Sequence, residues 1–172
     1  TLKDTINIDV GGTGALVWTG AADNDWNNIL NWGGCSLPSC NQDVYIPSAP
    51  VNQPAIFANG AATKGITIEV GASLTINPGF KLQICGNYIN NGTLNADPLS
   101  IVEMVGVVIG IQTMSGNLTG ASKFGNLSVI KNAGVEVDLL GDIDIASNFT
   151  INSGKFDCNS FIMKVGGNFK VF

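Results

Sequence analysis

Short runs of alternating apolar and polar residues recur along most of the chain, and each run is followed by Gly, Asn or Pro. From residue 66, for example, Ile66, Ile68 and Val70 alternate with Thr67 and Glu69, and Gly71 ends the run. Alternation over three to five residues between turn formers predicts half-buried β-strands. The pattern gives almost no indication of helix.

One short phrase repeats at intervals of about twenty residues toward the C-terminus. In each copy a small residue and an Asn precede a large apolar, a polar and a β-branched residue. Complete copies begin at Gly125, Ser147 and Gly167, and Gly86 begins a partial one. This spacing predicts a right-handed parallel β-helix of about 20 residues per coil. The predicted coils begin near residues 66, 86, 106, 126 and 147, with a sixth near 167.

The same alignment predicts which side chains point inward. Tyr88, Leu127, Phe149 and Phe169 are expected inside the helix, one above another, and the Asn residues before them are expected to form a ladder of turns. An antiparallel sandwich is the rival architecture. It favours two-residue hairpin turns, whereas the turns here recur at the repeat period.

Residues 1–63 lack the regular repeat and are predicted to form an N-terminal unit ahead of coils in residues 64–172. Alternation of Ile6, Ile8 and Val10 predicts a leading strand, and the chain's three tryptophans, Trp18, Trp26 and Trp32, follow within fifteen residues. We expect the tryptophans to cap the first coil, whose strand edges and apolar end would otherwise be open. The alternative is a platform on which sugar rings stack, which makes the same residues the candidate ligand-binding site.

The composition argues against several function classes. The 172 residues carry a net charge of -5, all eight positive charges are Lys, and there is no His. Nucleic-acid binding is not expected without Arg and with a repelling net charge. The commonest general base and zinc ligand is also missing. No apolar run is long enough for a membrane helix.

Four carboxylates form the strongest candidate for catalysis. Glu136, Asp138, Asp142 and Asp144 alternate with apolar residues and are expected to face outward from one coil. Two carboxylates on one face are what a glycosidase uses, so an enzyme would depend on Asp142 or Asp144. A solvated face that keeps the solenoid soluble is the simpler explanation. We therefore expect no enzymatic activity.

The cysteines and one acidic loop suggest local cross-links. Cys35 and Cys40 lie five positions apart beside Pro38 and are expected to close a small disulfide in an oxidising compartment. A zinc site would need two further ligands. Cys85 and Cys158 lie in strand-like runs and are expected to be small buried hydrophobes.

Asp23, Asn24 and Asp25 form an oxygen-rich loop that is a candidate calcium site. No bidentate Glu follows at the spacing that an EF-hand loop requires. A turn within the cap is therefore the main interpretation of this loop, with calcium as the alternative, and no other cofactor is expected.

A set of phrases resembles a known module. They are Trp18-Thr19-Gly20, Asp25-Trp26-Asn27, Asn31-Trp32, Leu37-Pro38 and Asp43-Val44-Tyr45-Ile46-Pro47, then GASLTI at 71–76 and FGNLSV at 124–129. Together they resemble the parallel β-helix segments of large, adhesin-like surface proteins in bacteria that use type IX secretion. The resemblance implies a β-helix, export and a cell-surface location, and it brings no catalytic residues. Asp4-Thr5-Ile6 also resembles the short O-glycosylation signal of such bacteria, which marks Thr5.

The two ends of the chain suggest how it is used. It begins at Thr1 without an initiator Met or a signal segment, as expected of a processed product. The final strand, with Phe169, Val171 and Phe172, is apolar and has no polar segment to cover it. An uncovered coil end is a template for another strand. The native chain is therefore expected to continue, or this end to dock on a second copy through the strand at Ile6, Ile8 and Val10.

These features predict an extracellular, non-enzymatic structural or adhesive module that can assemble into a filament. A carbohydrate-binding module of a secreted protein is the alternative. The expected partners are a second copy, the rest of a longer surface protein, or glycans.

Overall fold

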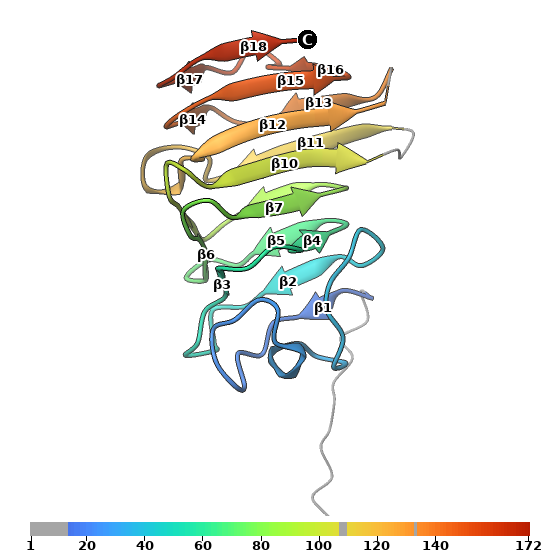
Figure 1. The fold of residues 1–172 in the computed structure, drawn as a ribbon, viewed down its shortest axis with the longest axis vertical. Coiled ribbons are helices and arrows are strands. Elements are labelled where there is room, and N and C mark those ends of the chain that lie inside the picture. Colours follow the sequence, from blue (N-terminus) through green and yellow to red (C-terminus); the bar gives the residue numbers. More distant parts are fainter. Residues whose placement is uncertain (1–13, 107–109, 133) are drawn as a thin grey trace, which may run out of the picture.

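The computed structural model describes residues 14–106, 110–132 and 134–172, and it shows a parallel β-solenoid (Figure 1). About six turns of about 22 residues each stack along one axis. All pairings between the strands of the described part are parallel, and this part contains two 3₁₀ turns but no α-helix. The predicted parallel β-helix is confirmed, and the antiparallel sandwich is wrong.

Two long sheets carry most of the strands. The first, sheet A, has seven strands: β1 (Leu16–Val17), β2 (Val44–Ile46), β5 (Ile66–Ile68), β8 (Tyr88–Asn90), β11 (Ile111–Gly116), β13 (Glu136–Leu139) and β16 (Lys155–Asp157). The second, sheet D, has six: β4 (Ala62–Thr63), β7 (Lys81–Ile84), β10 (Ile101–Gly106), β12 (Asn126–Lys131), β15 (Phe149–Ser153) and β18 (Phe169–Val171).

Two shorter sheets complete the coils. Sheet C contains β3 (Ala55–Ile56), β6 (Ser73–Ile76) and β9 (Thr93–Ala96), and sheet E contains β14 (Ile143–Ile145) and β17 (Met163–Val165). The 3₁₀ turn η2 (Gly120–Ser122) lies between them, because the Leu94 amide donates to Ser122 Oγ at 3.2 Å and Phe124 bridges Ile145. A second 3₁₀ turn, η1 (Ile29–Asn31), lies in the N-terminal segment.

The strands alternate as the sequence predicts, with apolar side chains inside. In sheet D the inward positions Leu127, Phe149 and Phe169 are in register. Tyr88 is buried too, but it pairs with Ile66 and Met114 in sheet A, so its predicted place in this ladder is wrong. The phrase at Gly86 resembles the later copies but belongs to another side of the coil.

The regular stacking begins earlier than predicted. Val44 and Ile46 on β2 pair in register with Ile66 and Ile68 on β5. The boundary at residue 63 therefore marks no break in sheet A, and the second half of the N-terminal unit already forms strand layers of the solenoid.

Candidate functional site

The three tryptophans form the centre of the N-terminal end. Trp18 and Trp26 pack edge-on against Trp32, with ring centroids 4.9 and 4.7 Å away, and all three side chains are buried. Two of the indole N–H groups have partners inside the protein: Trp18 donates to the Asn52 carbonyl at 2.7 Å and Trp32 to the Trp26 carbonyl at 2.8 Å. No ring face is left for a sugar, so the predicted stacking platform is wrong and the rings fill the cap.

The acidic loop is organised by Asn31, whose side chain is fully buried. Asn31 Oδ1 accepts from the amides of Ala22 and Asp23 at 2.9 and 3.0 Å, and its Nδ2 donates to Asp23 Oδ1 at 2.6 Å. Asp23 Oδ2 accepts from Asn28, and the bonds from Asn31 and Asn28 lower the pKa of Asp23.

Both oxygens of the Asp23 carboxylate are thus used within the turn. Asn24 and Asp25 contribute backbone bonds to the same region, and within the described ranges no three His, Cys, Asp or Glu residues gather in a way that could hold a metal ion. The geometry favours the turn role of this loop over the calcium alternative.

The N-terminal segment covers the first edges of three sheets by backbone pairing. On β1, the Val17 carbonyl accepts from Gly33 at 2.8 Å. On β3, Ala55 donates to Asn24 at 2.7 Å and accepts from Trp26 at 3.1 Å. Next to β4, Lys64 donates to the Gln42 carbonyl at 2.9 Å. Backbone groups at the first edge of each of these sheets are therefore paired with the N-terminal segment, as expected of a cap.

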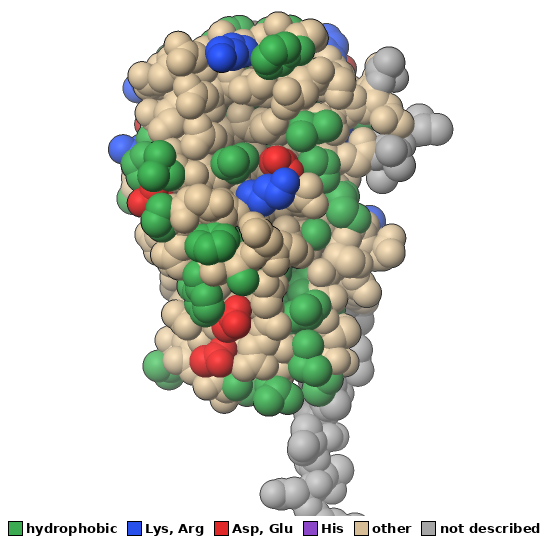
Figure 2. All heavy atoms as spheres, in the orientation of Figure 1, with side chains coloured by type: hydrophobic (Ala, Val, Ile, Leu, Met, Phe, Trp, Pro, Cys, Tyr) green, Lys and Arg blue, Asp and Glu red, His purple; other side chains and the backbone are tan. Residues whose placement is uncertain are grey.

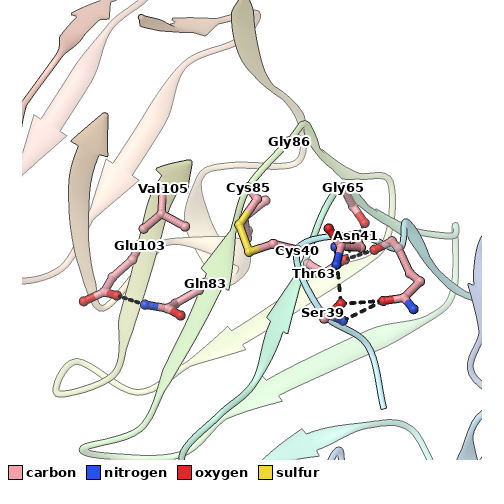
Figure 3. Close-up of a disulfide and its surroundings, with 12 residues drawn as sticks. Ser39, Cys40, Asn41, Thr63, Gly65, Gln83, Cys85, Gly86, Glu103 and Val105 are labelled. Carbon is pink, nitrogen blue, oxygen red and sulfur yellow. Dashed lines mark hydrogen bonds between the residues drawn. A yellow bond between two sulfur atoms is a disulfide. The ribbon is translucent and has the colours of Figure 1, made fainter. Parts of the chain in front are cut away.

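A disulfide fastens this cap to the coils, but its partners differ from those predicted. Cys40 is bonded to Cys85 at the end of β7, with the Cα atoms 5.4 Å apart (Figure 3). Cys35 is free and exposed. Cys35 lies at the surface, whereas the bonds of Thr63 and Lys64 to the Gln42 carbonyl hold the Cys40 segment beside β4 and β7. The bond therefore joins layers rather than closing a small loop.

The remaining cysteine predictions hold in part. Cys85 is buried, yet it is disulfide-bonded and not a free hydrophobe. Cys158 is a free thiol at intermediate exposure, packed against the core, and burial raises the pKa of its thiol.

The C-terminal end has no comparable cover within the described residues. Phe169, Val171 and Phe172 are 55%, 64% and 80% exposed, although Phe149, one layer below Phe169, is completely buried. Ile162, beside β17, is also exposed. This end of the molecule, drawn red at the top of Figure 1, presents strand edges together with these exposed apolar side chains. We call it the open end and define it by β16, β17 and β18.

The hydrogen-bond pattern shows what the open end lacks. The Leu127 amide donates to the Asn148 carbonyl at 3.0 Å, and the Phe149 amide donates to the Asn168 carbonyl at 2.9 Å. By the same pattern, the Phe169 amide points away from β15, toward the position that the next layer would occupy. On β16, Lys155 donates to Val135 in the layer below, so the Phe156 amide faces the open edge, since alternate residues of a parallel strand bond to opposite neighbours.

A ladder of Asn side chains also runs from layer to layer toward the open end. Asn126 Oδ1 accepts from the Asn148 amide at 3.2 Å, and Asn148 Oδ1 accepts from the Asn168 amide at 3.0 Å. These bonds confirm the predicted ladder of turns for Asn126, Asn148 and Asn168. Asn87 lies outside it and accepts from Thr113 instead. Asn168, in the last layer, occupies the position from which the next step of the ladder would be made.

The side face over these strands is largely polar. A shallow groove there is lined by Glu103, Asn126, Ser128, Asn148, Thr150, Asn152 and Lys170, among others. Figure 2 shows this face with few charged groups. Two of its amides, Asn126 and Asn148, serve the ladder, so we assign the groove a structural role.

The four predicted carboxylates do not come together as a catalytic pair. Glu136 and Asp138 lie on β13 in sheet A, and Asp144 lies on β14 in sheet E. Glu136 forms an ion pair with Lys155, Asp142 accepts from the Ile162 amide at 2.9 Å, and Asp144 accepts from Gly120 at 3.1 Å. The expectation of one shared outward face is wrong. Lys81 pairs with Glu103 at 3.1 Å, away from these four carboxylates.

Four predicted residues lie outside the described part of the chain, and three residues that hold the cap together were not predicted. Thr5, Ile6, Ile8 and Val10 lie outside the described residues. Asn31, Gln42 and Asn52, which hold the cap together, were missed. Asn31 stands directly before Trp32, and an Asn next to a buried aromatic residue was the one sequence feature that pointed to its role in the cap.

No helix in the described part is both long and apolar enough to cross a bilayer.

The described part of the fold defines the class: a parallel β-solenoid with a cap at its N-terminal end. More particularly, the chain belongs to DUF8693, a family described as a domain of unknown function, whose model matches residues 17–115 and so spans the cap and the first coils. No curated protein and no solved structure matches the chain.

Proposed function

We propose that this chain is a non-enzymatic structural or adhesive module of the extracellular cell surface that assembles head to tail. The observation that carries the proposal is the difference between its ends. The cap covers the first edges of β1, β3 and β4, whereas β16, β17 and β18 present open edges and exposed apolar side chains. Open strand edges are templates for pairing with another chain.

The capped end also offers apolar surface. Ile29 and Leu30, on η1 at the lower end of the molecule in Figure 1, are 46% and 60% exposed. A contact between two different surfaces of one chain does not close on itself unless the rotation forms a ring. Repeated contact between an open end and a capped end therefore builds a filament.

The extracellular location rests on separate support. The disulfide between Cys40 and Cys85 is typical of proteins folded in an oxidising compartment. The resemblance to type IX-exported surface modules points to the same location, and repeat modules of that kind serve as scaffold or adhesive. The alternative of a carbohydrate-binding module draws no support from the cap, because its three indole rings are buried.

Sedimentation velocity across a range of protein concentrations tests the assembly. The wild type is expected to form larger species as concentration rises, and Val171→Lys on β18 is expected to raise the concentration needed for assembly by about 100-fold or more, since an unpaired charge buried at a contact costs several kcal/mol. Val70→Lys is the matched control, because Val70 is 72% exposed on the side of the solenoid. A wild type that stays monomeric at all concentrations would contradict the proposal.

The location is tested on intact cells of the native host. Cys35 is exposed and free, so a membrane-impermeant maleimide should label it without lysis. Cys35→Ser is the control for labelling at this thiol. Labelling of Cys35 that appears only after lysis would overturn the surface location.

A further inference from the structure

The two ends of the described solenoid carry opposite charge. Residues 14–63, which form the cap and the first strand layers, contain three Asp and no Lys. Residues 155–172, from β16 onward, contain three Lys and one Asp. Complementary charge favours a contact between a capped end and an open end, whereas two like ends repel each other.

Four of these charges are available for a contact with another molecule. Asp23 and Asp25 at the capped end, and Lys164 and Lys170 at the open end, form no ion pair with another described residue. The other charged side chains of the two segments are paired within the chain. Asp23, Lys164 and Lys170 are exposed, and Asp25 is half-buried.

Asp25 and Lys164 lie on the same side of the solenoid. Asp25 bridges Ala55 on β3, and β3, β6 and β9 continue along the axis as sheet C. On this side η2 follows, and then β14 and β17 form sheet E, in which Lys164 is in register with Asp144. This side of the described coil therefore has Asp25 at the capped end and Lys164 at the open end.

We propose that a second copy stacks in line on the open end, with Asp25 of the second copy facing Lys164 of the first. This inference rests on the proposed head-to-tail assembly and adds the rotation between successive copies. The sheet C side of one copy then continues the sheet E side of the copy below it. Lys164 already lies one layer above Asp144, so Asp25 of the next copy extends an alternation of acidic and basic side chains.

A zero-length cross-link tests this contact in the assembled wild type. Carbodiimide joins a carboxylate to an amine that touches it, so a ladder is expected on a denaturing gel, with a peptide pair that links Asp25 to Lys164. Such a pair reports two copies, because the seven strands of sheet A span about 29 Å from first to last at a spacing of about 4.8 Å. Assembly without this peptide pair would overturn the proposed contact.

Charge reversal at Lys164 provides a test without chemical modification. Lys164→Glu is expected to raise the concentration needed for assembly about tenfold or more, because it places like charges opposite each other. Lys123→Glu is the matched control, since it changes the net charge equally at an exposed side chain directly after η2, and should shift this concentration by no more than about twofold. Circular dichroism checks that both variants keep the strand signal.

Asp25→Asn then identifies the partner of Lys164. Asp25 Oδ1 accepts from the Asn27 amide at 2.9 Å, and Asn keeps this acceptor while it loses the charge. The substitution should weaken assembly of the wild type about threefold but strengthen assembly of Lys164→Glu, since it removes an attraction from the first and a repulsion from the second. The same effect in both backgrounds would overturn the pairing and leave the head-to-tail assembly standing. A wild type that does not assemble would contradict both.

Discussion

The ring of Phe169 stacks on the ring of Phe149, with centroids 5.2 Å apart and planes 6° from parallel. The two residues are equivalent positions of consecutive layers, yet Phe149 is buried and Phe169 is 55% exposed. The difference is the layer that covers Phe149 and is missing above Phe169. This pair therefore shows that a further layer buries the inward-facing ring of the layer below it.

Replacing each ring by Ala should separate stability from assembly. Phe149→Ala is expected to lower the free energy of unfolding by about 3–5 kcal/mol, because it leaves a cavity in the core. Phe169→Ala should cost only about 1 kcal/mol in the monomer, since half of the ring is in water. Urea unfolding measures the first effect and sedimentation the loss of assembly in the second. Equal destabilisation by both would contradict the assigned burial.

Loss of the Cys40–Cys85 bond should loosen the cap. Cys40→Ser is expected to lower the free energy of unfolding by about 2–4 kcal/mol, since the bond closes a loop with a sequence separation of 45 residues. Cys85→Ser should have a similar effect, and a reductant should add nothing further to either variant. Cys35→Ser is the control and should unfold like the wild type. A large effect of Cys35→Ser would restore the small loop predicted from the sequence.

The tryptophans should matter for folding and not for sugar binding. Trp26→Ala is expected to destabilise the chain by about 3–5 kcal/mol, since the ring is buried against Trp32. This differs from the platform interpretation, in which the substitution abolishes glycan retention and leaves the fold intact. Thermal unfolding beside a glycan-array measurement decides between the two, and an unchanged melting temperature with lost glycan binding would contradict the cap.

Lys131 should make stability rise with pH. Its side chain is buried and donates to the Val105 carbonyl at 2.7 Å, and burial lowers the pKa of Lys131 to about 8. Between about pH 8 and 10 the unfolded chain keeps this proton while the folded chain loses it, so unfolding costs more as pH rises. The expected gain is on the order of 1–2 kcal/mol.

The measurement is urea unfolding at pH 7.5, 8.5 and 9.5 for the wild type and Lys131→Met. Burial raises the pKa of Cys158 and of Tyr88, and deprotonation of these groups lowers stability at high pH. Both contributions are present in the two proteins, so the difference between them isolates Lys131. A difference that does not change with pH would rule out this assignment.

The repeat predicted the fold because the solenoid imposes the same environment once per turn. Alternation and turn residues are local properties, so the in-register layers of Leu127, Phe149 and Phe169 were visible in the sequence. Tyr88 was misplaced because each coil has several sides with the same alternation, and a local phrase does not say which side it occupies.

The contacts of the cap depend on positions far apart in the chain. The disulfide joins residues separated by 45 positions, and the buried bonds of Trp18 and Asn31 depend on how the irregular segment folds back over β1 and β3. No local pattern encodes these pairings. The open end was predictable, since it required only that the last strand be apolar.

The central claim, that the open end of one copy takes up another, is tested most directly by negative-stain electron microscopy of the purified wild type. The account predicts long, uniform fibres with an axial repeat of at least roughly 34 Å, because the seven strand layers of sheet A stack at about 4.8 Å. Isolated particles the size of one subunit, at concentrations where the chain remains folded, would contradict it.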